Sequence, residues 1–251
     1  MNNISLNPDF SISKTELSIV YQPQFNIETN EIVGLEALFR ATSISNIESF
    51  IATLESNKVV HLLDYYMIEE TFKLVKTMET QWHRVIPISV NVSKTTLLRK
   101  DFHRKLESLL IKYNITTKYI DLELTERELI DDLELLNIAI KKVRKLGIQI
   151  SIDDFGVGFS TLLAISQLDF DTLKIDKAFI CKIGDNGKVD SILHGIKNIM
   201  DKNNIITIAE GVELKSQQKA LLNCGYKYAQ GYLFSKPKPI SYIAKSINTV
   251  S

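Results

Sequence analysis

The sequence predicts an α/β fold, a modified TIM (β/α)₈ barrel with an antiparallel first strand. The chain has 251 residues, the size of one such barrel. Eight strand-like runs recur along it, and from the third run onward helical patterns mostly separate them, which favours a parallel sheet. These runs cover residues 18–25, 32–39, 85–92, 119–124, 148–153, 172–176, 205–210 and 226–231.

The first two runs break this alternation. The segment that joins them, NIETNE (26–31), has the length of a hairpin loop and is too short for a parallel crossover. We therefore expect the first strand to run antiparallel to the second. No linker-like segment divides the chain, so the predicted organisation is an N-terminal extension (1–17) followed by a single barrel domain (18–251).

The clearest helical pattern is ERELIDDLELLNIAIKKVRKLG (126–147). Its acidic residues lie early and its basic residues lie late, which complements the helix dipole. Gly147 follows and suits a C-terminal cap.

Composition and charge argue against several classes of function and location. Hydrophobic residues make up 45% and charged residues 24%, and Lys+Arg and Asp+Glu number 30 each, so a polymeric nucleic acid is not an expected partner. The first ten residues have no secretory-signal pattern, and no long apolar run predicts a membrane span. Cys181 and Cys224 are expected to be reduced thiols of a cytoplasmic protein, and the four histidines lack metal-ligand spacing.

Polar residues alternate with apolar ones in three of the strand-like runs. In IDLELT (120–125), the isoleucine and leucines share one face, while the aspartate, glutamate and threonine share the other. If the apolar faces contact the helices, Asn91, Glu123 and Asp153 point into the barrel near the C-terminal ends of their strands. That rim is where barrel enzymes carry their chemistry.

Five of the polar groups at strand ends are carboxylates, which repel one another unless a cation lies between them. Oxygen ligands with one amide and no thiolate suit Mg²⁺ or Mn²⁺, and five acids suggest two ions that share a bridging carboxylate, as in phosphoester hydrolysis. The alternative, favoured for any single acid, is a helix cap or a surface ion pair. The strand-end groups are Glu36, Asn91, Glu123, Asp153, Asp154, Lys174, Glu210 and Gln230.

Seven motifs occur in the order of a known family. The chain resembles the EAL domain family of cyclic di-GMP phosphodiesterases from about Ser18 to Ile247. A single Glu-Ala-Leu triplet would carry no weight, but seven ordered motifs are specific. They are GLEALFR (34–40), SVNVS (89–93), LELTE (122–126), DDFGVGFS (153–160), LKID (173–176), AEGVE (209–213) and QGYLFSKP (230–237).

The resemblance implies hydrolysis of cyclic di-GMP to linear pGpG with two Mg²⁺ or Mn²⁺ ions per active site. By carry-over, one ion has Glu36, Asn91, Glu123 and Asp153 as ligands. Asp153 bridges to the second ion, whose other ligands are Asp154 and Glu210, and Glu210 also counts among the catalytic residues. Lys174 resembles the catalytic residue that orients or deprotonates the attacking water.

Further positions follow from the same resemblance. Gln22, Arg40 and Gln230 resemble substrate-binding residues, with Gln230 at the metal–water site. Glu126 and Glu213 resemble glutamates that anchor loops near the site. A homodimer is also an expectation of the resemblance.

The chain departs from the family pattern in two places. Ala41 stands where the family usually has a large residue, and the following segment is short and lacks a proline. In the loop after the paired aspartates, Val157, Phe159 and Thr161 replace a common threonine, tyrosine and serine. These changes affect the substrate entrance and the loop, and none removes an implied ligand.

Three functions remain open. The chain is an active phosphodiesterase, a catalytically silent cyclic di-GMP receptor, or a protein-interaction module on the same scaffold. The intact carboxylate set with Lys174 and Arg40 favours the first. A kinase-like metal loop at DDFGVG (153–158) is rejected, because the chain lacks a glycine-rich phosphate loop at its start and a catalytic-loop pattern.

Overall fold

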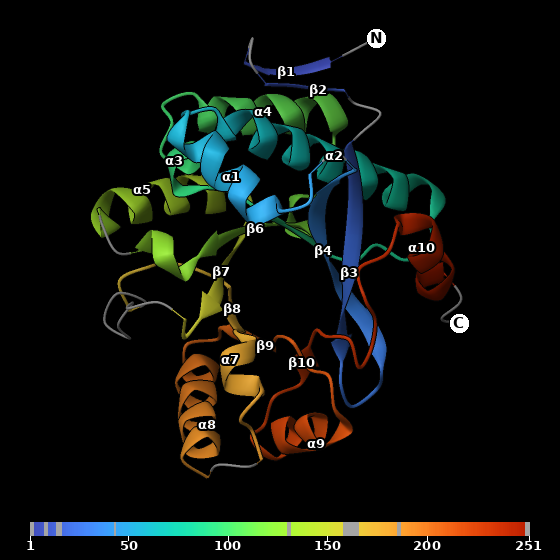
Figure 1. Cartoon of the computed structure of the whole chain (residues 1–251), viewed down its shortest axis with the longest axis vertical. Coiled ribbons are helices and arrows are strands. Elements are labelled where there is room, and N and C mark those ends of the chain that lie inside the picture. The colour runs from blue at the N-terminus through green and yellow to red at the C-terminus, as the bar shows by residue number, and fades with distance from the viewer. Residues whose placement is uncertain are drawn as a thin grey trace.

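The structure, a computed structural model, has an eight-stranded closed barrel and a separate pair of short strands near the N-terminus (Figure 1). The pair consists of β1 (Asn3–Asn7) and β2 (Phe10–Ser13), which are antiparallel to each other. Side chains are described over residues 17–42, 44–129, 132–157, 166–184 and 187–247. The backbone is described over residues 3–7, 10–13, 17–42, 44–129, 132–157, 166–184 and 187–248.

The barrel confirms the predicted fold class. Strand β3 is antiparallel to both of its neighbours, β4 and β10, and every other neighbouring pair in the barrel is parallel. A tight turn between β3 and β4 causes the antiparallel pairing, as its length predicted. Around the barrel the strands are β10 (Tyr228–Ala229), β3 (Leu17–Asn26), β4 (Glu31–Ala41), β5 (Ile88–Asn91), β6 (Ile120–Thr125), β7 (Gln149–Phe155), β8 (Thr172–Ile175) and β9 (Ile206–Ala209).

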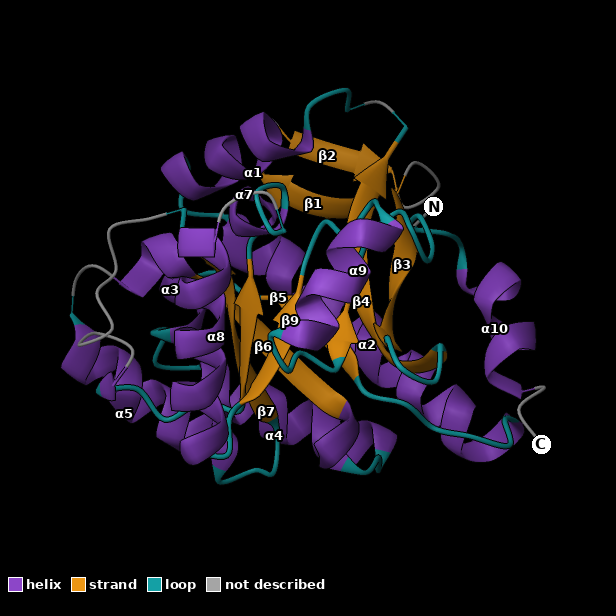
Figure 2. Cartoon of the chain, turned by 90° about the horizontal axis from the view of Figure 1, so that it is seen from below, coloured by secondary structure: helices purple, strands orange, loops and turns teal. Residues whose placement is uncertain are grey.

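Helices surround the strands (Figure 2). None of the described helices is both long enough and apolar enough to cross a membrane. The helices are α1 (Ile47–Ser56), α2 (Val60–Gln81), α3 (Lys94–Leu97), α4 (Phe102–Tyr113), α5 (Leu133–Arg144), α7 (Lys177–Ile180), α8 (Gly187–Lys202), α9 (Lys215–Asn223) and α10 (Ile240–Asn248), with 3₁₀ turns η1 (Thr117–Tyr119) and η2 (Glu126–Leu129).

The helix predicted over residues 126–147 is wrong at its start. Residues 126–129 form the 3₁₀ turn η2, and α5 begins only at Leu133. Asp132 has a left-handed backbone with φ 54°, which an α-helix cannot continue through, so the two pieces are separate. The end of the helix agrees with the prediction: basic residues occupy the last turn of α5, and Gly147 follows with φ 81°.

The apolar face of the barrel wall packs against the helices as predicted. Ile120, Leu122 and Leu124 of β6 have no exposed surface, and neither do Ile150 and Ile152 of β7. Full burial of such a side chain stabilises the fold by about 1.5–3 kcal/mol. The opposite face of the same strands points into the barrel and carries the polar residues.

Candidate active site

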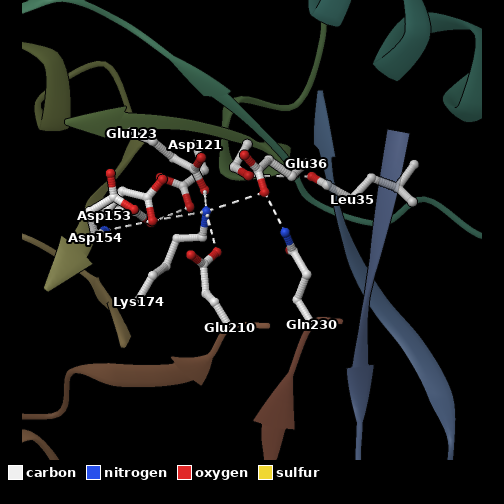
Figure 3. Close-up of polar contacts among 11 residues, drawn as sticks. Leu35, Glu36, Asp121, Glu123, Asp153, Asp154, Lys174, Glu210 and Gln230 are labelled. Atoms are coloured by element: carbon white, nitrogen blue, oxygen red, sulfur yellow. Dashed lines mark hydrogen bonds and ion pairs between the residues drawn. The ribbon is translucent and has the colours of Figure 1, made fainter. Parts of the chain in front are cut away.

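A lysine lies at the centre of the acidic groups inside the barrel. Lys174, on β8, has no exposed surface, and its ammonium contacts four carboxylates (Figure 3). Its Nζ lies 2.8 Å from Glu210 Oε1 and 3.0 Å from Glu123 Oε1. It also lies 3.3 Å from Asp153 Oδ1 and 3.4 Å from Glu36 Oε2. Side chains from four strands and one strand-end loop therefore converge on one point.

The acids form two groups that share one member. Glu36, Glu123 and Asp153 each offer a carboxylate oxygen, and these oxygens lie within 4.8 Å of one another. The same holds for Asp153, Asp154 and Glu210. Because Asp153 belongs to both groups, it has the place of a bridging carboxylate between two neighbouring cations.

A local distortion of β7 explains how two adjacent aspartates serve one site. In a regular strand, successive side chains point to opposite faces. Here the register with β8 shifts between Ile152 and Phe155, and Asp154 has a left-handed backbone with φ 58°. The Asp154 N–H also donates a hydrogen bond to Asp153 Oδ1 at 2.8 Å. The distortion replaces strict alternation, so both carboxylates reach the same cluster.

The charges in the cluster do not balance. Five carboxylates face the Lys174 ammonium, which leaves a formal charge of about −4 when all are ionised. Burial raises the pKa of Glu123 well above its usual value, although Lys174 opposes this. Burial, and then the charge of Asp153, raises the pKa of Asp154 to about 6. Protons or further cations must therefore neutralise part of the cluster.

Burial and the neighbouring carboxylates also shift the pKa values of Lys174 and Glu210. Burial favours a neutral amine at Lys174, but the attraction of Asp153, Glu123, Glu210 and Glu36 outweighs it and holds the pKa well above the usual range. Burial, and then the charge of Asp153, raises the pKa of Glu210. The lysine is thus an ammonium ion at neutral pH.

The donor set fits hard divalent cations such as Mg²⁺ or Mn²⁺. Among the described residues, neither buried carboxylate oxygen of Glu123 accepts a hydrogen bond, and Gln230 Oε1 has no partner. Gln230 instead donates from Nε2 to Glu36 Oε2 at 2.5 Å. Buried acceptors without donors are costly, and a bound cation would satisfy them. All of these ligand atoms are oxygens, which are the ligands that such ions prefer.

Asn91 differs from the other predicted ligands because its side chain is exposed. It ends β5 directly beside Glu123, which is its backbone partner on β6. Its amide therefore lies at the rim of the barrel, next to the first acid group, and it makes no hydrogen bond to another described side chain.

The predicted substrate-binding residues of the β3–β4 hairpin flank the cluster. Gln22 is the cross-strand partner of Glu36, so the two side chains share a face of the sheet. Arg40 lies four residues after Glu36 on the same face of β4, half-buried, and its Nη1 donates to Phe39 O at 2.7 Å. Both residues are thus placed along one approach to the acids.

The two predicted loop anchors differ. Glu126 is 1% exposed, and its Oε2 accepts hydrogen bonds from the N–H groups of Gly156 (3.0 Å) and Val157 (3.1 Å), in the loop after β7. The Glu213 side chain is exposed and makes no hydrogen bond or ion pair with the described residues, so the structure shows no contact by which it would anchor a loop. Its backbone N–H donates to Gln217 Oε1 instead.

The structure describes two of the four positions that depart from the family pattern. Val157 is 42% exposed, and Ala41 is buried at the end of β4. Phe159 and Thr161 lie outside the described residues.

Two further acids, one of them beside the cluster, were missed by the sequence interpretation. Asp121 precedes Glu123 by two residues on the inner face of β6 and lies beside the cluster (Figure 3), and Ser151 Oγ donates to its Oδ2 at 2.5 Å. Burial raises the pKa of Asp121 to about 7. The alternation in 120–125 already placed it on the polar face, so the signal was present. Glu128 accepts a hydrogen bond from the Lys94 N–H at 2.6 Å, a contact between distant segments that no local pattern reveals.

The fold and the site together define a modified TIM barrel whose mouth holds two acid groups joined by one aspartate. The family model described as EAL domain matches residues 6–237, nearly the whole chain. The chain belongs to the EAL domain family.

Three similar proteins are named for cyclic di-GMP or have it bound in their structures. The chain is 28% identical over 230 residues to "Cyclic di-GMP phosphodiesterase NbdA" of Pseudomonas aeruginosa, a match that covers 90% of this chain and 29% of that protein. The structure of the EAL enzyme Bd1971, in its cAMP- and cyclic-di-GMP-bound form, has a TM-score of 0.86 and 33% identity, covering 93% of this chain and 65% of that one. The PaMucR phosphodiesterase in complex with c-di-GMP has a TM-score of 0.83 and 26% identity, covering 91% and 99%. The chain spans less than half the length of the curated relatives it matches.

Proposed function

We propose that this chain hydrolyses one phosphodiester bond of cyclic di-GMP to give linear pGpG, with two Mg²⁺ or Mn²⁺ ions held in the mouth of the barrel. The observation that carries the proposal is the position of Asp153, which belongs to both acid groups around Lys174. Membership of the EAL family and the cyclic di-GMP named for its relatives support this choice of substrate.

The residues of the two acid groups would hold the ions. Glu36, Asn91 and Glu123 would bind one, Asp154 and Glu210 the other, and Asp153 would bridge them. Two bound divalent ions acidify a water molecule and stabilise the charge that develops on a phosphate. They would also offset the formal charge of about −4 that the cluster carries when fully ionised.

Lys174 would orient the attacking water. Its Nζ lies 2.8 Å from Glu210 Oε1 and 3.3 Å from Asp153 Oδ1, so it could donate a hydrogen bond to a water molecule beside these carboxylates. Holding that water in a fixed position beside the substrate would favour its attack on the phosphate. Glu210, which contacts Lys174 at 2.8 Å, would hold the ammonium in place as well as bind an ion.

The hairpin β3–β4 would bind the substrate. Arg40 offers a guanidinium group, which matches the oxygens of a phosphate, and Gln22 lies opposite Glu36 on the neighbouring strand β3. Gln230 would complete the site from β10's side, where its amide contacts Glu36.

The proposal extends to organisation, assembly and location. We assign residues 1–17 to an extension and residues 18–251 to the catalytic barrel, because β1 and β2 pair with each other and with no barrel strand among the described residues. We also expect a homodimer in the cytoplasm, where the two cysteines would remain reduced. Light scattering of the purified chain tests the dimer.

The activity is tested by incubating the purified chain with cyclic di-GMP and either Mg²⁺ or Mn²⁺ and separating the products by chromatography. We expect pGpG from the wild type and none from Glu36→Ala or Lys174→Ala. Glu134→Ala, which removes an exposed acid of α5, is the matched control and should keep full activity. Binding of cyclic di-GMP without turnover would favour a silent receptor, and no binding would favour a protein-interaction module.

A further inference from the structure

The turn η2, directly after β6, carries two carboxylates that reach in opposite directions. Glu126 accepts hydrogen bonds from the loop after β7, as described above. Glu128 reaches the turn after β5 instead: its Oε1 accepts the N–H of Lys94 at 2.6 Å. Its Oε2 accepts the N–H and the Oγ1 of Thr125 at 3.2 and 3.3 Å. One carboxylate thus joins the ends of two neighbouring strands.

The turn after β5 is also held from its other side. Asp64, on α2, is 7% exposed, and its Oδ2 accepts the N–H and the Oγ of Ser93 at 3.1 and 2.7 Å. Ser93 Oγ in turn accepts the N–H of Thr96 at 3.2 Å and caps α3. Residues 93 and 94 therefore lie between two acids from different elements, so their backbone has little freedom to move.

These contacts bear on the first acid group because of where Asn91 and Glu123 stand. The two residues are backbone partners at the ends of β5 and β6. Lys94 follows Asn91 by three positions, and Thr125 follows Glu123 by two. The hydrogen bonds of Glu128 to Lys94 and Thr125 therefore connect the ends of the two strands. The Asn91 side chain is exposed and makes no hydrogen bond to another described side chain, so its backbone alone sets its position.

We propose that Glu128 is a positioning residue, which sets the distance between Asn91 and Glu123 and thereby the affinity of the first acid group for a divalent ion. The inference rests on the proposed function, in which Asn91 and Glu123 bind the same ion. Glu128 itself touches neither the ion nor the substrate. Residues that orient metal ligands from outside typically change metal affinity by about 10–100-fold when they are replaced.

The test compares Mn²⁺ binding by calorimetry in the wild type and in Glu128→Gln. A glutamine accepts with only one atom, so either the Lys94 or the Thr125 N–H loses its acceptor. We expect about 10–100-fold weaker Mn²⁺ binding and faster hydrogen exchange at the Lys94 and Thr125 amides. Turnover should recover at saturating Mn²⁺, because the ligands themselves are unchanged. Glu134→Gln makes the same chemical change on the exposed face of α5 and should leave all of these values unaltered.

A double-mutant cycle with Asn91→Ala shows whether Glu128 acts through Asn91. If it does, Glu128→Gln should weaken Mn²⁺ binding far less when Asn91 is already absent. An equal loss in both backgrounds, or wild-type affinity in a folded Glu128→Gln variant, would overturn the proposal. If Glu128→Gln does not fold, Glu128→Asp, which keeps the charge but shortens the reach, carries the same comparison.

The phosphodiesterase activity and the role of Glu128 can be refuted by different results. A wild type that binds Mn²⁺ but does not hydrolyse cyclic di-GMP would refute the phosphodiesterase activity, while the affinity comparison would still decide the role of Glu128. A wild type that binds no Mn²⁺ would overturn both.

Discussion

The two faces of the barrel wall are about equally buried. Burial of the apolar outer face stabilises the fold, whereas burial of the acidic inner face costs free energy. On the outer face of β6, Ile120 and Leu122 have no exposed surface and pack against helices. On the inner face of the same strand, Asp121 and Glu123 are 9% and 1% exposed, and three of their four carboxylate oxygens accept no hydrogen bond from described residues. The outer face stabilises the chain by itself, whereas the inner face needs a cation that the chain does not supply in sufficient number.

The comparison separates folding from function along one strand. A buried apolar side chain stabilises the fold by about 1.5–3 kcal/mol. A buried charge costs several kcal/mol unless it is well paired, and one ammonium cannot pair with five carboxylates. Changes on the inner face should therefore act on metal binding and turnover, and can also change stability, whereas changes on the outer face should act on stability alone.

The largest effect is expected from removing the central charge. Lys174→Met should lower turnover of cyclic di-GMP by about 10³-fold or more, because the attacking water loses its donor. It should also lower the unfolding free energy of the metal-free protein by about 3–5 kcal/mol, because the buried acids lose their cation. Steady-state kinetics and denaturant unfolding measure both. Lys219→Met, at an exposed lysine of α9, is the control, and wild-type turnover in Lys174→Met would refute the role of the lysine.

On the outer face, the expected effect falls on stability. Leu122→Ala should lower the unfolding free energy by about 2–5 kcal/mol, since it leaves a cavity in a fully buried site. Mn²⁺ affinity of the folded fraction should stay within about twofold of the wild type, because the removed atoms face away from the acids. Ile111→Ala, at a residue that is 82% exposed, should change stability by about 0.5 kcal/mol or less. A large loss of Mn²⁺ affinity in Leu122→Ala would show that the two faces are not independent.

A buried acid of α2, outside the acidic cluster, should make the unfolding free energy depend on pH. Burial raises the pKa of Asp64 to about 6, although hydrogen bonds from Thr96 and Ser93 oppose the shift. Below about pH 3 the group is mostly protonated in both the folded and the unfolded chain. As the pH rises to about 6, the unfolded chain releases this proton first, so the wild type loses about 3 kcal/mol of stability.

Asp64→Asn should lack this loss. Its unfolding free energy relative to the wild type should therefore rise by about 3 kcal/mol between pH 3 and pH 7, as measured by denaturant unfolding at each pH. A difference that is constant over this range would mean that Asp64 is ionised in the folded protein throughout.

The sequence predicted the features that depend on local pattern. The alternation in 120–125 and 148–153 placed Glu123 and Asp153 inside the barrel, and the short segment 26–31 predicted the antiparallel strand. The helix that was predicted to start at 126 failed because Asp132 adopts a left-handed backbone, which helical periodicity does not encode.

Contacts between distant segments were beyond the sequence. The shift of register that turns Asp153 and Asp154 toward one site depends on pairing with β8. The bond from Lys94 to Glu128 joins residues 34 positions apart, and the exposure of Asn91 depends on how the rim closes. Each of these is decided by packing around the closed barrel, which only the three-dimensional arrangement reveals.

The central claim is that the inner face of the barrel is completed by two divalent ions, and a calorimetric titration of the wild type with Mn²⁺ tests it most directly. We expect about two ions per chain. We also expect proton release that grows as the pH falls toward 6, because Asp154, whose pKa is raised to about 6, must lose its proton to bind. A titration that gives no binding, or one ion without proton release, would show that two divalent ions do not complete the inner face of the barrel.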